Sequence, residues 1–169
     1  KVELERYWQG AGRDTRFNPQ SMSKTVAALL VGIAIGDGVI ASVHDRAGRY
    51  APEFKSGDRA GITIEHLLQM SAGLAQITTS YEISSANPGA RQHFGGDFIG
   101  PMLELEVANP PGEKWDYNNN ETLMLTYVLQ QATGEEYAAY LSRKLWKPLG
   151  LPPAEMYLYR EGGNVLTSC

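Results

Sequence analysis

The sequence predicts a single α+β domain in which helices predominate. Its length of 169 residues suits one domain, at roughly 150 residues per domain. Apolar residues make up 43% of the chain, charged residues 20% and aromatic residues 9%, which is typical of a folded globular protein. Several segments carry apolar residues at helical spacing between glycine or proline stops, whereas one short segment alternates as a strand does.

Composition excludes several classes of partner and site. The chain has 15 Lys and Arg against 19 Asp and Glu, a net charge of -4 without a basic cluster. Such a chain is a poor candidate for binding nucleic acid or an anionic membrane. Its single cysteine, Cys169, can form neither an internal disulfide nor a zinc site, and the three histidines have no spacing typical of a metal site.

The strand-like segment lies at Glu3–Trp8, near the start of the chain. The chain has no initiator Met, and residues 162–169 resemble a turn followed by the start of a strand. We therefore expect a fragment, the alternative being a complete small domain with frayed ends. A leader could precede Lys1, so the compartment stays open between cytoplasmic and periplasmic.

A buried helix is expected directly after this region. Asn18 and Pro19 form a helix start signal, every residue from Val26 to Ile35 is apolar or glycine, and residues 36–38 form a stop. A helix that is apolar on all sides is predicted to be buried. Ten residues are too few to span a bilayer, which needs about 20.

The rest of the chain is predicted to be mainly helical, with Trp8, Trp115 and Trp146 in the core. Trp115 lies two residues before Tyr117 and could instead border a pocket there. Residues 75–96 have no periodicity and predict a long surface loop, a kind of loop that is often functional. The predicted helices are a short one capped by Thr63, one over residues 98–107, one through Leu123 and Val128 that Gly134 ends, and one through Tyr137 and Leu145 that Pro148 ends.

Ser21 and Lys24 place a hydroxyl and an amine three residues apart at the start of the buried helix. Side chains at this spacing lie on one helix face, with Cβ atoms about 5–6 Å apart. The helix dipole and partial burial both favour the neutral amine, which could take the serine proton. N–H groups of the first turn could help to hold an oxyanion. The alternative is a capping serine beside a solvated lysine, but the apolar run that follows favours the reactive pair.

Tyr117, Asn118 and Asn119 form a second polar cluster. The tyrosine hydroxyl could relay a proton, and Asn119 could hydrogen-bond a substrate carbonyl. An asparagine-rich tripeptide is also an ordinary turn, so this cluster alone does not favour a site.

A family resemblance rests on five segments in a fixed order along the chain: residues 21–24, 62–74, 110–112, 117–119 and 148–151. With these segments the chain is similar to the serine β-lactamase and penicillin-binding-protein-like hydrolases, most of all to the class C-like branch. That branch includes esterases, D-aminopeptidases and 6-aminohexanoate-dimer hydrolases, and residues 5–10 followed by residues 21–24 most resemble the last group.

The resemblance implies a role for each site residue. Ser21 would be the acylated nucleophile, Lys24 its proton acceptor, and Tyr117 the partner in proton transfer to the leaving group and from the deacylating water. Asn119 would contact the substrate. No metal or organic cofactor is implied. The Tyr-Asn-Asn form argues against the class A branch, which has Ser-Asp-Asn there.

The family's third motif, a His or Lys followed by any residue and Gly, is missing after Tyr117. Lys55–Gly57 and His93–Gly95 fit its letters but precede the second motif, so we expect both to be loop residues. We therefore expect residues 1–169 to form one incomplete domain. It would hold the helical subdomain and nucleophile helix of a β-lactamase/transpeptidase-like fold, with most of the antiparallel sheet absent.

The expected function is hydrolysis of an amide or ester of a small carboxylic acid through an acyl-Ser21 intermediate. The similarity favours a short linear amide or ester over a β-lactam. The expected partner is this small-molecule substrate, with neither nucleic-acid binding nor membrane insertion. The alternatives are a catalytically silent binding module on the same scaffold, and a peptidoglycan D-Ala-D-Ala peptidase or β-lactamase.

Overall fold

The computed structural model describes residues 2–77, 87–94, 98–156 and 167. These residues form helices and short turns without a strand; two isolated antiparallel bridges join Arg46 to Thr63 and Leu74 to Val107. The prediction that helices predominate is confirmed. None of the described helices is both long enough and apolar enough to cross a bilayer.

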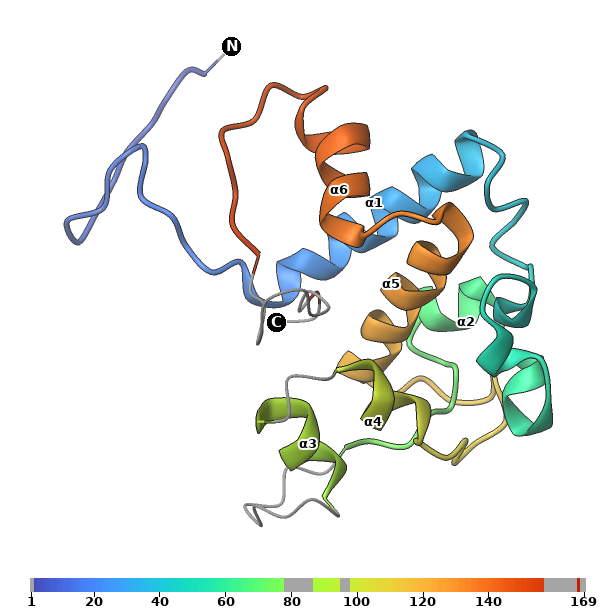
Figure 1. Cartoon of the computed structure of the whole chain (residues 1–169). Coiled ribbons are helices and arrows are strands. Elements are labelled where there is room, and N and C mark those ends of the chain that lie inside the picture. The colour runs from blue at the N-terminus through green and yellow to red at the C-terminus, as the bar shows by residue number, and fades with distance from the viewer. Residues whose placement is uncertain (1, 78–86, 95–97, 157–166, 168–169) are drawn as a thin grey trace.

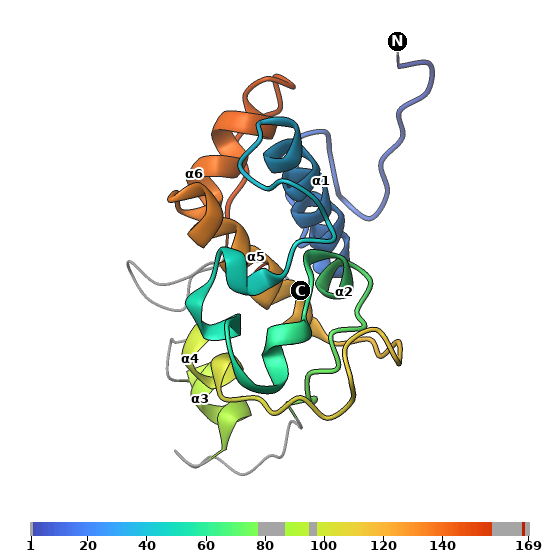
Figure 2. The same ribbon diagram turned by 90° about the vertical axis from the view of Figure 1, so that its right-hand side faces the viewer.

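Helix α5 (Asn119–Thr133) lies at the centre of the helical body (Figures 1 and 2). Almost every residue from Asn120 to Leu129 is buried, and Gly134, with φ +68°, ends the helix as predicted. It contacts α1 (Ser23–Gly36), α2 (Ile64–Leu68), α4 (Ile99–Leu103) and α6 (Tyr137–Leu141). The central helix therefore connects the elements on all sides of the core.

Helix α1 follows a 3₁₀ turn, Gln20–Met22, and contains the predicted apolar run. Its core face is formed by Ala27, Leu30, Val31 and Ala34, all at most 1% exposed. Leu29 is 53% exposed, so the expectation that the helix is buried on all sides is wrong for the described structure. An apolar composition permits burial all round, but the described residues cover mainly the side that packs against α5.

The remaining helices follow the predicted apolar spacing, with shifted bounds. Thr63 caps α2 as expected, since its hydroxyl accepts the N–H of His66 at 3.1 Å. Helix α4 is shorter than the predicted segment 98–107, and α6 continues into a π-helical turn, Ser142–Trp146. Helix α3 (Pro88–Phe94) occupies part of the predicted loop over residues 75–96 and packs against α4.

Two other predictions are wrong. Glu3–Trp8 is not a strand: the segment is exposed and extends away from the helices, since no described strand pairs with it (Figures 1 and 2). Trp8 and Trp115 are 71% and 66% exposed, so neither belongs to the core. Trp146 is half-buried and donates from Nε1 to the Pro152 carbonyl at 2.7 Å. Apart from Thr167, the strand expected near the C-terminal end lies outside the described residues.

The segment after α2 depends on one glycine. Gly73 has φ +77°, and a Cβ there would lie 2.0 Å from the backbone oxygen of Asn109. The carbonyl of Gly73 also accepts the N–H of Ala108 at 2.8 Å. The backbone of residues 108–109 therefore approaches this segment too closely for any side chain.

We expect Gly73→Ala to lower the free energy of unfolding by at least about 2 kcal/mol, because it adds a backbone clash to the cost of a left-handed residue. Gly134→Ala is the matched control: its φ is +68°, but no atom lies within 4 Å of the added Cβ. It should cost only about 1 kcal/mol. Equal losses in urea unfolding would show that the contact with Asn109 has no energetic weight.

Candidate active site

Ser21, Lys24 and Tyr117 meet at one oxygen atom. The Ser21 Oγ accepts from Lys24 Nζ at 2.9 Å and from the Tyr117 hydroxyl at 2.7 Å. Lys24 Nζ also lies 5.1 Å from the centre of the Tyr117 ring. The structure thus brings together three of the four residues named from the sequence, although Tyr117 is 96 positions away from Ser21.

The turn that carries Ser21 is held by local hydrogen bonds. Asn18 Oδ1 accepts the N–H of Gln20 at 2.9 Å, and the Ser23 hydroxyl donates to the Gln20 carbonyl at 2.8 Å. Gln20 has φ +50°, a left-handed conformation that costs of order 1–3 kcal/mol for a residue with a side chain. These bonds offset that cost and fix the backbone immediately before Ser21.

The expectation that first-turn N–H groups hold an oxyanion is not supported for Met22 and Ser23. The N–H of Met22 donates to the Pro19 carbonyl at 3.1 Å. The N–H of Ser23 donates to the Gln20 carbonyl, because the chain enters α1 through a 3₁₀ turn that satisfies these groups internally.

Tyr117 lies in the turn that precedes α5. Asn118 caps the helix: its Oδ1 accepts the N–H of Asn120 at 3.0 Å, and its Nδ2 donates to the Leu74 carbonyl at 3.0 Å. The side-chain Nε2 of Gln76 donates to the Tyr117 carbonyl at 2.7 Å. The Tyr117 ring is 46% exposed, so its position depends on these backbone contacts more than on packing.

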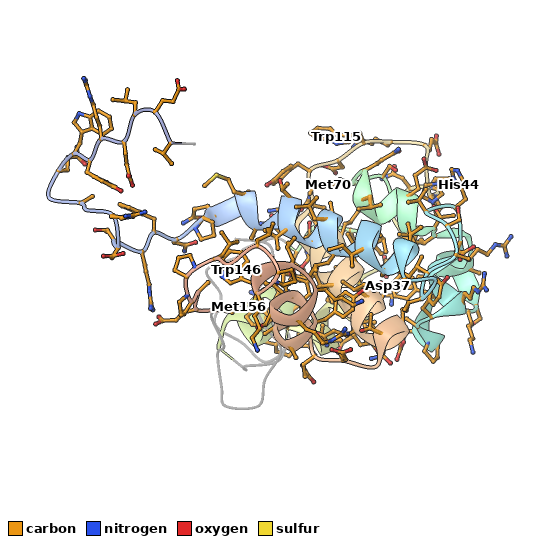
Figure 3. The ribbon with its side chains drawn as sticks, turned by 90° about the horizontal axis from the view of Figure 1, so that it is seen from above. Asp37, His44, Met70, Trp115, Trp146 and Met156 are labelled. Carbon is orange, nitrogen blue, oxygen red and sulfur yellow. The ribbon has the colours of Figure 1, made fainter. Side chains whose placement is uncertain are left out.

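Asn119, the fourth predicted residue, is the first residue of α5 and is exposed. Trp115, two residues before Tyr117, lies at the edge of the molecule near Met70 (Figure 3). Met22, next to Ser21, is 70% exposed. Asn119, Trp115 and Met22 thus lie within two residues of Tyr117 or Ser21 in the sequence, and a substrate could contact them.

A buried carboxyl lies in the first turn of α5, four residues after Tyr117. Glu121 is 1% exposed, and its Oε2 accepts the N–H of Ala72 at 3.0 Å. Burial raises its pKa to about 7, against the opposing effect of hydrogen bonds from the N–H groups of Ala72, Leu74 and Gly73; the nearby charge of Asp116 raises it further. This carboxyl is therefore partly protonated near neutral pH.

Sequence reasoning missed Gln76 and Glu121 and gave Asn118 no role of its own. One signal was present, because Asn118 and Glu121 have the spacing of a capping box. That pattern predicts a glutamate that folds back onto its own helix. The structure instead shows it bonded to a segment 49 positions earlier in the chain.

The two segments that fit the third motif lie elsewhere. Lys55 and Ser56 are exposed between two 3₁₀ turns, as expected, whereas His93 lies in α3 and not in a loop. Gly95 lies outside the described residues. Within the described ranges, no group of three His, Cys, Asp or Glu side chains could hold a metal ion.

Comparison with known proteins identifies the family. Residues 1–168 match the family model described as Beta-lactamase. The chain belongs to the Beta-lactamase family. A solved structure with a TM-score of 0.77 is a candidate 6-aminohexanoate-dimer hydrolase from Bacillus anthracis, 21% identical, of which 46% is covered by 98% of this chain. At that identity the likeness shows a shared fold, so the helices match part of a β-lactamase-family fold, as predicted.

Two curated proteins have similar sequences. Protein flp of Staphylococcus aureus (strain NCTC 8325 / PS 47) is 25% identical over 143 residues, which cover 82% of this chain and 28% of that protein. Penicillin-binding protein 4* of Bacillus subtilis (strain 168) is 27% identical over 144 residues, covering 83% and 30%. The chain therefore spans less than a third of the curated relatives it matches.

The pKa of Glu121 predicts a pH-dependent stability. Because this pKa rises from 4.5 to about 7 on folding, the folded state binds the proton more tightly. The stabilisation is full below pH 4.5 and is lost as the pH rises through 7, by at most about 3 kcal/mol. Glu121→Gln should flatten this decline in urea unfolding between pH 5 and 7.5.

Other carboxyls should not obscure this window. Hydrogen bonds from Lys144, Tyr50 and Arg91 lower the pKa values of Asp37, Asp45 and Glu104 respectively. Their stabilising contributions are therefore lost only at more acidic pH. Parallel stability curves for the parent and Glu121→Gln between pH 5 and 7.5 would contradict the raised pKa.

Proposed function

We propose that this chain carries the nucleophile and proton-transfer groups of a serine hydrolase of the Beta-lactamase family. It would cleave an amide or ester of a small carboxylic acid through an acyl-Ser21 intermediate. The observation that carries the proposal is the convergence of Lys24 Nζ and the Tyr117 hydroxyl on Ser21 Oγ, at 2.9 and 2.7 Å. A serine beside two groups able to exchange protons has the arrangement of an activated nucleophile.

Acylation requires Lys24 as the amine, which takes the Ser21 proton. Ser21 Oγ then bonds to the substrate carbonyl carbon, whose π electrons move to the carbonyl oxygen. When the carbonyl reforms, the bond to the leaving nitrogen or oxygen breaks, and the Tyr117 hydroxyl donates a proton to that atom. Lys24 reprotonates Tyr117, which leaves an acyl-serine, a released amine or alcohol, and a neutral amine.

Deacylation uses the same groups in reverse. Water gives a proton to the Lys24–Tyr117 pair and attacks the acyl carbon; the Ser21 oxygen leaves and regains that proton. The ammonium formed at Lys24 faces the Tyr117 ring at 5.1 Å, and the ring face stabilises it by about 0.5–1 kcal/mol at an exposed site. Asn119 is assigned a substrate contact by its place two residues after Tyr117.

The sequence similarity favours a short linear amide or an ester over a β-lactam as substrate. The exposed Met22 and Trp115 suit an acyl or leaving group with an apolar body. A peptidoglycan D-Ala-D-Ala peptide or a β-lactam is the alternative substrate within the family. Turnover of matched amide, ester, peptide and β-lactam substrates by the full protein distinguishes them.

A catalytically silent binding module is the second candidate. The engagement of the Met22 and Ser23 N–H groups within their own turn favours it, since these groups are not available to an oxyanion. A silent module would bind a carboxylic amide or ester without acylating Ser21.

We expect a fluorophosphonate probe to add one adduct to the full protein, at Ser21, and Ser21→Ala to abolish it, since the reactive oxygen is gone. Intact-mass and peptide spectrometry would detect and place the adduct. Ser56→Ala, which changes an exposed serine between two 3₁₀ turns, is the control and should label as the parent does. A parent protein that gives no adduct would favour the binding module.

Lys24→Met should slow labelling by about 10²–10⁴-fold, because a positioned proton acceptor contributes about that much to a rate. Labelling time courses at pH 6 to 9 would measure the loss. Lys55→Met is the matched control, because it makes the same substitution at an exposed lysine between two 3₁₀ turns, outside the candidate site. Equal rates for both variants would remove Lys24 from the mechanism.

A further inference from the structure

The buried carboxyl of Glu121 has no part in the steps above. We propose that it is a positioning residue for the proposed reaction: by bonding to the backbone of Ala72, it fixes the segment Met70–Gln76, which in turn holds Tyr117 against Ser21. This inference rests on the proposed function for its catalytic effect.

Glu121 is hydrogen-bonded to the segment Met70–Gln76. Its side chain is 1% exposed, and Oε2 accepts the N–H of Ala72 at 3.0 Å. The N–H groups of Gly73 and Leu74 also stabilise the charged carboxylate. A buried carboxyl without such donors is costly, so this contact constrains both partners.

The segment Met70–Gln76 is in turn hydrogen-bonded to the turn that contains Tyr117. The Met70 carbonyl accepts the N–H of Asp116 at 2.9 Å, and the Gln76 amide donates to the Tyr117 carbonyl at 2.7 Å. Asn118 Nδ2 donates to the Leu74 carbonyl between these two contacts. The segment therefore bonds to three consecutive residues centred on Tyr117.

Residues 108–109 restrain the segment on the side away from α5. The Gly73 carbonyl accepts the N–H of Ala108 at 2.8 Å, and Gly73 has no room for a Cβ beside Asn109. Met70 is itself left-handed, with φ +56°. The segment thus lies in one defined position between α5 and residues 108–109.

A shift of this segment would move the Tyr117 hydroxyl relative to Ser21 Oγ. The Tyr117 ring is 46% exposed, so core packing does not fix it independently. A misplacement of about 1 Å in a reacting group can cost about 10²-fold in rate. The Glu121 carboxyl keeps an acceptor oxygen for the backbone N–H groups in either protonation state and offers two when it is ionised, whereas a glutamine has one acceptor oxygen and an NH₂ that would face backbone donors.

The experiment measures the rate of fluorophosphonate labelling of Ser21 in variants of the full protein. We expect Glu121→Ala to slow labelling by about 10–100-fold and Glu121→Gln, which keeps one acceptor oxygen, to recover part of the loss. Leu129→Ala is the control for general destabilisation, because Leu129 is 1% exposed on the same helix. It should label within a few-fold of the parent.

A double-mutant cycle tests whether Glu121 acts through Tyr117. In a Tyr117→Phe background, Glu121→Ala should slow labelling little further, because the hydroxyl that it positions is already gone. Full additivity of the two changes would overturn the proposal. So would parental labelling by a folded Glu121→Ala or, if that variant fails to fold, by Glu121→Gln.

Amide hydrogen exchange separates this proposal from the proposed function. Glu121→Ala, or Glu121→Gln, should speed exchange at Ala72 and Asp116 relative to Leu129→Ala, whether or not Ser21 reacts. If exchange is faster in the variant but the parent is not labelled, Glu121 does fix the segment Met70–Gln76, and the proposed hydrolase function is contradicted. Unchanged exchange would overturn the Glu121 proposal even where Ser21 labels normally.

Discussion

The packing of α5 against α1 is the constraint on which the candidate site depends. Ser21 lies in the turn before α1 and Tyr117 in the turn before α5, so the distance between their oxygens follows from how the two helices meet. The buried face of α1 includes Ala27 and Ala34, whose small side chains permit close approach to a neighbouring element. Burial of a leucine such as Leu30 contributes about 1.5–3 kcal/mol, which holds the two helix starts together.

Apolar packing alone does not place the reacting groups. Ser21 is exposed and Tyr117 is nearly half exposed, so the core determines where the helices begin but not where these side chains point. Backbone hydrogen bonds do that second task, at the left-handed Gln20 on one side and in the segment after the left-handed Met70 on the other. Strained residues of this kind persist only where their surroundings hold them.

The sequence was most informative where structure is determined locally. The helix signals at Thr63 and Gly134 need only their neighbours, and Ser21 and Lys24 lie on one helix turn, so these features could be predicted. Glu3–Trp8 could not, because an alternating pattern becomes a strand only beside a partner. The environment of Glu121 could not be predicted either. The capping-box spacing predicts a bond within its own helix, whereas the observed bond joins Glu121 to a residue 49 positions earlier in the chain.

The proposed mechanism needs two proton carriers. A single base that takes the Ser21 proton holds it on the attacking side, whereas the leaving group needs a proton at another atom. Lys24 and Tyr117 approach the same oxygen from different elements, α1 and the turn before α5, so one can accept while the other donates. Lysine and tyrosine side chains within one hydrogen-bonded cluster can then exchange the proton between half-reactions. The relative placement of α1 and α5 would therefore determine both the reactivity of the serine and the return of the site to its starting state.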